Sequence, residues 1–397
     1  MNILYLCDEY PPCQHGGIGT VTQNLARTLV EKGHKVVVAG FYPYYRKATK
    51  SENDKGVKVY RFFYGSKFQL QFSKRKFSGR FINIERQFNN YIDCLKKIIQ
   101  ENEIDIIESP DFVEAFRYSG PRMIQFPDFG IPFLIKLHGS YTYFNFIENK
   151  RSKFSKLFKK EKLLLDNASG VIAMSKFVKN KIKSLFNYDK KVCLIYNGID
   201  CNLSAIYNAN QTCNTVVFAG SLEEKKGVFS LIKAWREIVS TIPSARLLIY
   251  GRGSNKTIKL LNDLIIMMAI KTIELKGFVL KEDLPGIYAS ASCAIFPSYA
   301  ETFGMAPIEA MAVGCPTIFT KRTSGPEIID HGVNGLLVDP DNIQEIASAV
   351  ISMLANRNQA IEMGKKGVKK VRDNFDIKLI AEKHIDYYNG LIGQNQS

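Results

Sequence analysis

Two glutamates eight positions apart, Glu301 and Glu309, lie in the stretch with the clearest chemical content, Ala294–Ala312 (AIFPSYAETFGMAPIEAMA). The stretch begins as an apolar strand, and Gly304 and Pro307 fit poorly within a helix but well at its start. We therefore expect Glu301 on a strand-to-helix loop and Glu309 inside the first helical turn. Backbone amides at an open helix end favour phosphate, and carboxylates accept hydrogen bonds from sugar hydroxyls. The pattern indicates a site for a sugar joined to a diphosphate.

Two further features lie in the first half of the chain. Gly16–Gly19 (GGIG) precedes an expected helix, so the backbone around Gly17 and Gly19 can approach a phosphate closely. It is not GxGxxG, which weakens a dinucleotide-binding interpretation, and a simple turn remains the alternative. His138 follows an apolar strand, at the end of a sheet where reacting groups are presented, with a structural histidine as the alternative. The aromatic residues at 141–146 line an acceptor pocket or pack the next helix.

In the second half, Gly220–Gly227 (GSLEEKKG) follows an expected strand. Lys226 stands at a helix entrance, well placed to neutralise a diphosphate, although lysines there are often only solvated. Gly251 and Arg252 follow the next strand, where the backbone can approach a nucleotide base. Thr323–Glu327 (TSGPE) is another strand-to-helix loop, in which capping of the helix is the simpler role.

The elements that position these residues alternate between strand and helix along the whole chain. We predict a first doubly wound α/β domain with a parallel sheet over residues 1–196, and a second over 197–374. Residues 375–397 are expected to cross back and brace the first domain. Ligands of such sheets bind outside the carboxyl ends of the strands, so we expect the active site between the two domains. The expected elements are the strands Ile3–Cys7, Lys35–Ala39, Ile104–Ile107, Pro132–Leu137, Gly170–Ala173, Lys191–Ile195, Thr215–Ala219, Arg246–Tyr250, Ile273–Lys276, Cys293–Phe296 and Pro316–Phe319, with helices that include Thr20–Lys32, Ile84–Gln100, Val228–Val239 and Ile377–Leu391.

Charge is unevenly distributed along the 397 residues, whose formal net charge is +16. Residues 1–200 hold 33 Lys/Arg against 19 Asp/Glu, a net of +14, and the remainder hold 21 against 19, a net of +2. The basic stretches Lys67–Arg80, Lys150–Lys162 and Lys176–Lys191 suit an anionic membrane face or acceptor, or are solvated helix faces without a partner. No nucleic-acid-reading module is recognisable, so nucleic acid is not expected as a partner.

Other totals narrow the class of protein. No apolar run is long enough to span a membrane, and the N-terminus does not have the pattern of a signal peptide. The eight cysteines show no zinc spacing and indicate reduced thiols. We therefore expect a cytoplasmic protein, with association at the inner face of the membrane as an extension of that expectation.

Taken together, these motifs resemble the retaining glycosyltransferases of family 4 (glycosyl transferases group 1), which have the GT-B fold of two Rossmann-like domains across a cleft. The resemblance covers nearly the whole chain, and the Glu301–Glu309 pair is its most specific part. Motifs that carry it are Gly16–Gly19, His138-Gly139, Asn197–Asp200 (NGID), Gly220…Lys226-Gly227, Gly251/Gly253, Glu301–Glu309 and Ser324–Glu327.

The resemblance implies transfer of a sugar from a nucleotide-diphosphate-sugar to a hydroxyl with retention of configuration, without a metal or another cofactor. It implies His138, Glu301 and Lys226 as catalytic residues. Implied donor-binding residues are Gly17, Gly19, Ser221, Gly251, Arg252, Glu301, Thr302, Phe303, Gly304, Met305 and Glu309. Ser221 departs from the pattern, because the family commonly has an arginine there, and Arg252, Lys321 and Arg322 are candidates to compensate for the missing charge.

The identity of the substrates stays open at this stage. A UDP-sugar is the expected donor, with GDP-mannose as the alternative, and the acceptor is expected to be a glycan or a lipid-linked sugar in surface polysaccharide or glycan biosynthesis. Alternative functions are a GT-B phosphorylase, a nucleotide-sugar epimerase and a non-catalytic carbohydrate-binding subunit. A dinucleotide-dependent oxidoreductase is disfavoured by the Gly-Gly-x-Gly motif and by the pair of glutamates.

Overall fold

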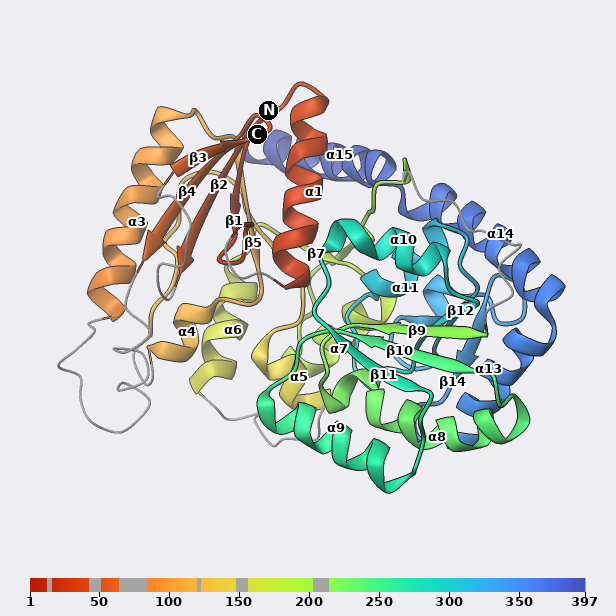
Figure 1. Cartoon of the computed structure of the whole chain (residues 1–397). Coiled ribbons are helices and arrows are strands. Elements are labelled where there is room, and N and C mark those ends of the chain that lie inside the picture. Colours follow the sequence, from red (N-terminus) through yellow and green to blue (C-terminus); the bar gives the residue numbers. More distant parts are fainter. Residues whose placement is uncertain are drawn as a thin grey trace. The chain divides into compact units, whose positions relative to one another are not determined.

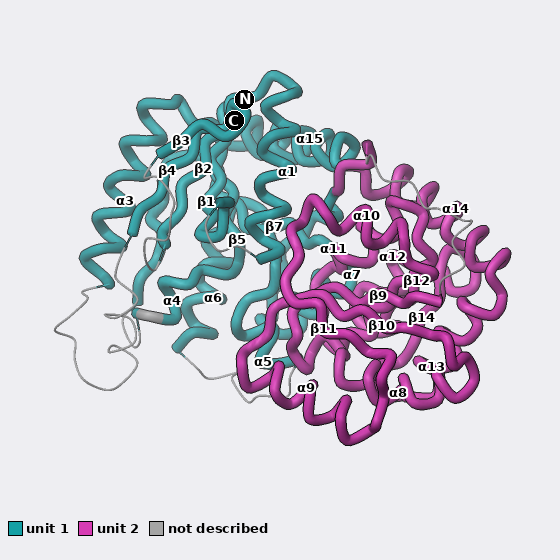
Figure 2. Tube along the Cα trace, in the orientation of Figure 1, with its two compact units in different colours: residues 1–198, 377–397 teal, residues 199–376 magenta. Residues whose placement is uncertain are grey.

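The computed structural model describes residues 1–12, 16–42, 51–63, 84–119, 123–147, 156–202 and 214–396. The chain divides into two compact units, residues 1–198 with 377–397 and residues 199–376 (Figure 2). The sequence had predicted a division into 1–196 with 375–397 and 197–374. Each unit is described below by itself.

Unit 1 is built on an eight-stranded sheet with the order β3-β4-β2-β1-β5-β6-β7-β8 (Figure 1). Every neighbouring pair is parallel except β3 and β4, which are antiparallel. The central strands are buried on both faces, which is typical of a parallel sheet covered by helices on both sides. Its strands are β1 (Asn2–Leu6), β2 (Lys35–Tyr42), β3 (Ser51–Asp54), β4 (Val57–Phe63), β5 (Ile106–Pro110), β6 (Phe133–Leu137), β7 (Gly170–Ala173) and β8 (Cys193–Leu194).

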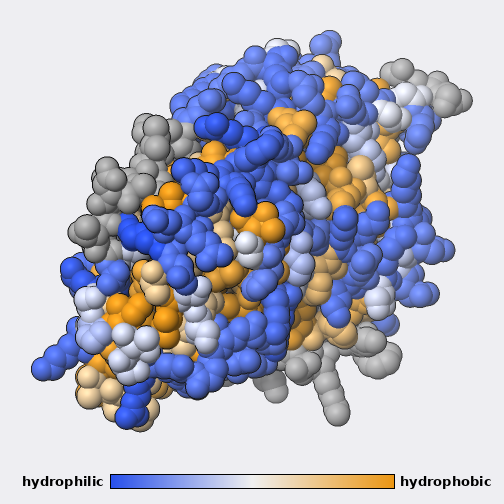
Figure 3. Space-filling view, turned by 90° about the vertical axis from the view of Figure 1, so that its right-hand side faces the viewer, coloured by the Kyte–Doolittle hydropathy of each residue, from blue (hydrophilic) through white to orange (hydrophobic). Residues whose placement is uncertain are grey.

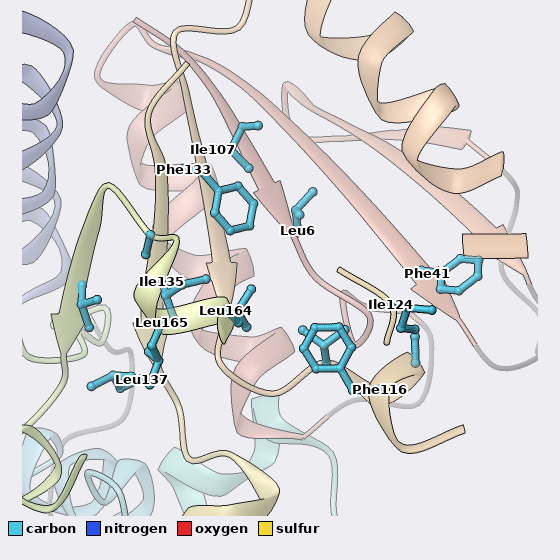
Figure 4. Close-up of a cluster of buried hydrophobic side chains, with 14 of the residues drawn as sticks. Leu6, Phe41, Ile107, Phe116, Ile124, Phe133, Ile135, Leu137, Leu164 and Leu165 are labelled. Carbon is cyan, nitrogen blue, oxygen red and sulfur yellow. The ribbon is translucent and has the colours of Figure 1, made fainter. Parts of the chain in front are cut away.

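Helices cover both faces of this sheet. On one face, a core that includes Phe116, Ile135, Leu164 and Leu165 (Figure 4) packs under α3, α4, α6 and α7. On the other face, α1 and the C-terminal helix α15 cover a second core (Figure 1). The helices of unit 1 are α1 (Gly17–Glu31), α3 (Ile84–Glu101), α4 (Glu114–Tyr118), α5 (Tyr141–Ile147), α6 (Lys156–Asp166), α7 (Lys176–Phe186) and α15 (Ile377–Gln396).

Unit 2 contains a six-stranded, fully parallel sheet with the order β11-β10-β9-β12-β13-β14. Trp235, Ile249 and Ile295 are fully buried in its core. Its strands are β9 (Thr215–Ala219), β10 (Arg246–Tyr250), β11 (Ile273–Gly277), β12 (Cys293–Phe296), β13 (Thr317–Thr320) and β14 (Leu336–Val338). Its helices are α8 (Val228–Thr241), α9 (Asn255–Met267), α10 (Leu284–Ala289), α11 (Met305–Ala312), α12 (Gly325–Ile328), α13 (Ile343–Ala355) and α14 (Arg357–Phe375), with the short 3-10 turns η1 (Glu224–Lys226) and η2 (Lys281–Asp283).

The predicted class of fold, two doubly wound α/β domains, is confirmed. One helix start was predicted wrongly, and one hairpin was missed. Helix α1 begins at Gly17, not at Thr20, because glycines are accommodated in its first turn. The hairpin of β3 and β4 was not expected.

Several sequence features lie outside the described residues. These are the basic stretch Lys67–Arg80, the first part of Lys150–Lys162, and most of the polar segment between the two halves, residues 203–213.

The surface face shown in Figure 3 is dominated by hydrophilic residues, with apolar residues gathered in smaller patches. Among the described residues, Leu260, Ile266 and Met267 of α9 are exposed large hydrophobic side chains. In the part of the chain that the structure describes, no helix is both long and apolar enough to cross a membrane.

Candidate functional site

The carboxyl ends of β9 and β12 bring a lysine and a glutamate into contact in unit 2. These strands are neighbours in the parallel sheet, so the loops that follow them meet at one edge. Lys226 Nζ lies 2.7 Å from Glu301 Oε1, and the side chains are 26% and 13% exposed. Ser298 Oγ donates a second hydrogen bond to the same oxygen at 3.0 Å. The pair is reachable from solvent yet held in place, as a site for a charged ligand requires.

Close backbone contacts fix the loop that carries Lys226. The N–H of Tyr299 donates to the carbonyl of Lys225 at 2.8 Å. Gly227 has a φ of 74°, and a Cβ there would lie 1.8 Å from the carbonyl oxygen of Pro297. Only glycine allows this approach, so the loops after β9 and β12 are locked together.

The loop after β10 joins the same assembly. Gly251 has a φ of 153°, and a Cβ on it would lie 1.8 Å from the carbonyl oxygen of Gly220. The N–H of Leu222 donates to the carbonyl of Arg252 at 2.8 Å. Gly251 and Arg252 thus lie beside the loop that carries Ser221 and Lys226.

Helix α11 begins directly after the glutamate loop, as the sequence predicted. Gly304, with a φ of 111°, precedes its first residue, Met305, so the amides of the first turn are open. Thr302 is half-buried, whereas the Phe303 side chain is buried and its carbonyl accepts a hydrogen bond from Ser324 Oγ. The TSGPE loop is therefore hydrogen-bonded to the loop that carries Glu301.

The predicted position of Glu309 within the first turn was wrong. Because α11 starts at Met305, Glu309 is its fifth residue and lies in the second turn. Its carboxylate is 4.0 Å from Lys281 Nζ and is 20% exposed. Burial raises the pKa of Glu309, and the Lys281 ammonium acts in the opposite direction. Glu309 is therefore a mostly buried hydrogen-bond acceptor on α11, the helix that begins after the Glu301 loop.

The positive charges proposed to compensate for Ser221 are all engaged elsewhere in unit 2. Ser221 Oγ donates to Glu223 at 3.4 Å. The Arg252 guanidinium lies 3.6 Å from the centroid of the Phe278 ring. Lys321 pairs with Asp339 and Glu345, and Arg322 pairs with Asp339 and Asp341. This leaves Lys226 as the candidate cation that the structure holds directly beside Glu301.

In unit 1, His138 is held at the end of β6 by backbone contacts. Its N–H donates to Asp111 Oδ1 at 2.7 Å and lies 3.1 Å from the carbonyl oxygen of Lys136. Gly139 N–H donates to Asp111 Oδ2 at 3.3 Å, and Asp111 N–H donates to the Lys136 carbonyl at 3.0 Å. The strand ends of β5 and β6 are thus tied into one rigid turn that presents the imidazole.

Burial sets the charge states in this turn. It holds the pKa of His138 well below its usual value, and the nearby positive charge of Lys136 lowers the pKa further. Burial also raises the pKa of Asp111 to about 8, although two backbone N–H groups stabilise its carboxylate. His138 is therefore an uncharged imidazole at neutral pH, able to accept or donate a hydrogen bond.

The glycine motif lies at the first turn of α1. Gly16 precedes the helix and its N–H donates to Glu9 Oε2 at 2.9 Å. Among the residues that the structure describes, none has an atom within 4 Å of a Cβ built on Gly17, so they leave the space in front of this residue open. Gly19 is buried in the helix. A single open glycine at a helix N-terminus fits the predicted approach of an anion.

Aromatic residues follow His138 on α5. Tyr143 is fully buried, but Tyr141 is half-buried and its ring lies 4.4 Å from that of Phe112. The Arg117 guanidinium lies 5.5 Å from the centroid of the Tyr141 ring. Of the predicted aromatic set, Tyr143 packs the core, whereas Tyr141 is half-buried and Phe146 is 38% exposed, so these two rings keep an accessible part.

Three site residues were missed by the sequence analysis. Ser298 fixes Glu301, Asp111 fixes the His138 turn, and Glu161 accepts N–H groups of Tyr141 and Thr142 at the start of α5. Burial raises the pKa of Glu161 to about 7. The SPDF sequence (residues 109–112) at the end of β5 was the available signal for Asp111, which directly follows a strand as His138 does.

The structure therefore gathers the predicted residues into two groups. Lys226, Glu301, Gly304, Met305 and Glu309 gather in unit 2 with the loops that hold Ser221, Gly251 and Arg252. Gly17, Gly19 and His138 belong to unit 1. That the two groups face each other stays a prediction.

Comparisons with known proteins match both units. The family described as Glycosyltransferase Family 4 matches residues 15–203, and the family described as Glycosyl transferases group 1 matches residues 202–370. An uncharacterized glycosyltransferase of Methanocaldococcus jannaschii is 28% identical over 415 aligned residues, which cover 98% of each chain. The capsular polysaccharide biosynthesis glycosyltransferase CapM of Staphylococcus aureus is 26% identical, over 62% of this chain and 68% of that protein.

Solved structures share the fold. The crystal structure of Anabaena HepE in complex with UDP and glucose matches 98% of this chain and 100% of its own, with a TM-score of 0.75 and 18% identity. At 18% sequence identity, this similarity is evidence for the fold alone.

Proposed function

Because this chain belongs to the group 1 glycosyltransferases of family 4, which have the GT-B fold, we propose that it transfers a sugar from a nucleotide-diphosphate-sugar to a hydroxyl group with retention of anomeric configuration. The observation that carries the proposal is the contact of Lys226 with Glu301 at the carboxyl edge of the unit 2 sheet. It combines a cation for a diphosphate with an acceptor for sugar hydroxyls.

The donor is held by groups that complement its charges. In the unbound protein Lys226 and Glu301 neutralise each other. On binding, the Lys226 ammonium turns to the diphosphate, and the open amides of Gly304 and Met305 add the positive end of the α11 dipole. Glu301 then accepts hydrogen bonds from the sugar, and Glu309 accepts those of the ribose.

Transfer requires stabilisation of the negative charge that develops on the leaving diphosphate. Lys226 and the helix amides supply positive charge at fixed positions, which is the kind of electrostatic preorganisation that lowers reaction barriers. We propose that this arrangement serves in place of a divalent ion. Full activity in the presence of EDTA is the expected result, and loss of activity restored by Mg²⁺ or Mn²⁺ would contradict it.

UDP is the proposed nucleotide, with GDP-mannose as the alternative donor. HepE, which shares the fold, was crystallised with UDP and glucose, and this supports the choice of UDP. His138 is proposed to lie beside the anomeric carbon, where an uncharged imidazole can hydrogen-bond a sugar hydroxyl without repelling the cationic transition state. Gly17 is proposed to approach the diphosphate through its open backbone.

The acceptor is proposed to be a hydroxyl of a glycan or of a lipid-linked sugar in the synthesis of a surface polysaccharide. CapM, a relative over most of its length, acts in capsular polysaccharide biosynthesis. The Tyr141 and Phe112 rings offer apolar faces of the kind on which sugar rings pack, and Arg117 adds a positive charge. These groups are at the same sheet edge as His138.

Peripheral contact with an anionic membrane is proposed for the basic half of the chain. Helices α6 and α7 carry lysines on their exposed sides, which suit a negatively charged surface. Sedimentation with liposomes that contain phosphatidylglycerol, at low and high salt, tests this. Salt-sensitive binding is expected, and equal recovery in the supernatant with and without liposomes would contradict it.

Retention can be tested without knowing the acceptor. The protein is incubated with UDP-glucose in D₂O, and the slow transfer of glucose to water is followed by proton NMR before mutarotation mixes the anomers. Because the donor is the α-anomer, retention releases α-glucose first. Initial release of β-glucose would refute the retaining mechanism.

A further inference from the structure

A buried polar network joins three strands of the unit 1 sheet to the C-terminal helix. It consists of Tyr5 on β1, Glu108 on β5, Lys136 on β6, and His384 and Tyr388 on α15. All five residues are at most 6% exposed. The proposed reaction uses none of them, although a buried carboxylate and a buried ammonium are unfavourable unless something compensates for them.

The donor and the acceptor can be assigned in both hydrogen bonds that link Tyr5, Tyr388 and Glu108. Tyr388 Oη donates to Glu108 Oε2 at 2.6 Å. Since the Tyr388 proton is used there, the 2.9 Å contact of its oxygen with Tyr5 Oη makes Tyr5 the donor. Tyr5 and Glu108 are also direct partners in the register of β1 and β5. Tyr5 therefore donates to Tyr388, and Tyr388 donates to the Glu108 carboxylate.

Donors and acceptors can also be assigned in the hydrogen bonds of Lys136 and His384. His384 Nδ1 lies 2.8 Å from the carbonyl oxygen of Ile380, which can only accept, so Nδ1 carries the proton. The other ring nitrogen then accepts from Lys136 Nζ, 3.3 Å away. Burial holds the pKa of His384 well below its usual value, and the Lys136 charge lowers it further. His384 is thus a neutral acceptor for a buried lysine.

The two sides balance each other in charge. Burial raises the pKa of Glu108 and lowers that of Lys136, and their mutual attraction opposes both shifts. Each side chain in the network has a hydrogen-bond partner, and the opposite charges of Glu108 and Lys136 attract each other, which are conditions that favour the burial of charged groups. It also fixes the register of α15, since His384 and Tyr388 are one helical turn apart and engage different strands.

Lys136 stands two residues before His138. Side chains alternate along a strand, so Leu134 and Lys136 face α15 while Ile135 and Leu137 face the opposite core. The backbone of Lys136 also holds the turn, because its carbonyl oxygen accepts the N–H of Asp111 and lies 3.1 Å from the N–H nitrogen of His138.

We propose that Lys136, hydrogen-bonded to His384 and attracted by the Glu108 carboxylate, is a positioning residue for the transfer reaction that fixes the end of β6 and places a positive charge near the His138 imidazole. The inference rests on the proposed function, because it takes His138 as the group beside the reacting carbon. It makes the C-terminal helix part of the catalytic architecture through Lys136.

The ionisable groups around His138 in unit 1 come from several elements. Lys136 on β6, the strand that precedes His138, and His384 on α15 oppose a positive charge on the imidazole. Asp111, after β5, engages the backbone of the His138 turn, and Glu161 of α6 engages the backbone at the start of α5. Removal of the Lys136 charge therefore leaves a neighbourhood in which the imidazolium is less disfavoured.

The direct test is the titration of His138 in Lys136→Met. The protein is labelled with ¹³C at histidine Cε1, and the His138 signal is assigned from its loss in a His138→Gln variant. The midpoint should rise by about one to two pH units, the usual effect of a neighbouring charge. An unchanged midpoint in a folded Lys136→Met would overturn the proposal.

Lys160→Met is the matched control, since Lys160 of α6 is equally buried and bonds to Ser119 and to the carbonyl of Phe116. This variant should lose stability but leave the His138 midpoint in place. An equal shift in both lysine variants would also overturn the proposal, because any buried lysine would then have the same effect.

Measurements of kcat and KM against pH distinguish a positioning role of Lys136 from a role in stability alone. In Lys136→Met the acidic limb of the kcat profile should move to higher pH, and kcat should fall while KM for the donor stays unchanged. Lys136→Gln, which keeps a donor for His384 without the charge, should keep β6 bonded to α15 but should move the acidic limb as Lys136→Met does. A profile that keeps its wild-type shape in both variants would contradict the proposal.

If Lys136→Met does not fold, the double variant Glu108→Gln/Lys136→Met removes both buried charges together and is used for the same titration, with the same expected rise. The proposed function is tested separately by His138→Ala. Full transfer activity in that variant would remove His138 from the reaction, while the NMR titration would still decide whether Lys136 controls its protonation.

Discussion

Replacement of Glu301 by alanine is the sharpest perturbation of the proposed donor site. Glu301 Oε1 accepts from Lys226 at 2.7 Å and from Ser298 at 3.0 Å, so the carboxylate is already oriented before the sugar binds. A hydrogen bond to a charged group contributes about 1.5–3 kcal/mol. Loss of one such bond to the sugar in the transition state should reduce kcat/KM by about 10- to 150-fold.

The assay is release of UDP from UDP-glucose by wild type and Glu301→Ala, with the thermal unfolding of both recorded in parallel. Glu274→Ala is the control, because Glu274 is another ion-paired glutamate of unit 2, in contact with Arg246 and Lys276 at the edge strand β11. It should lose little activity. A folded Glu301→Ala with wild-type kcat/KM, or an equal loss in Glu274→Ala, would refute the assignment of Glu301.

Two further predictions concern the loops that hold the site. An alanine in the left-handed conformation costs roughly 1–2 kcal/mol. Gly227→Ala should lower the free energy of unfolding by more than this, because its Cβ would meet the Pro297 carbonyl. Gly277 has a similar φ but, among the described residues, no contact for a Cβ, so Gly277→Ala should show only the cost of the left-handed conformation in a denaturant titration. If both variants lose the same amount, the contact with Pro297 is unimportant. Burial raises the pKa of Asp111 to about 8, so the folded protein keeps a proton that the unfolded chain releases above about pH 4. The contribution of Asp111 to stability should therefore decrease as the pH rises through this range, and Asp111→Asn should show a smaller fall in melting temperature from pH 5 to pH 8 than wild type. Parallel curves would contradict the raised pKa.

Much of the fold was accessible from the sequence because apolar strands alternate with helical patterns. β7, β9, β10 and β12 begin and end at the predicted residues; Gly220 follows β9, Gly251 follows β10 and Pro297 follows β12, so the ends of these three strands were visible in the sequence. The hairpin of β3 and β4 was missed because Ser51–Asp54 is a polar edge strand that gains its partner only in the sheet. Glu309 was placed one turn too early because Pro307 was taken to mark the helix start.

The candidate site was predicted in its residue types but not in its contacts. Glu301 and Lys226 are 75 positions apart, and their pairing depends on β9 and β12 being neighbours in the sheet. Asp111 and Lys136 were not predicted as site residues, since a buried charge is recognised only when its partners are known. The network that includes His384 joins residues 248 positions apart and has no local signal in the sequence.

The central claim, a diphosphate site built around Lys226, is tested most directly by calorimetric titration of UDP into wild type and Lys226→Met. Loss of a charged hydrogen bond of about 1.5–3 kcal/mol should weaken UDP binding by about 10- to 150-fold, while uridine should bind both proteins equally weakly. Equal affinity of wild type and a folded Lys226→Met for UDP would contradict the account.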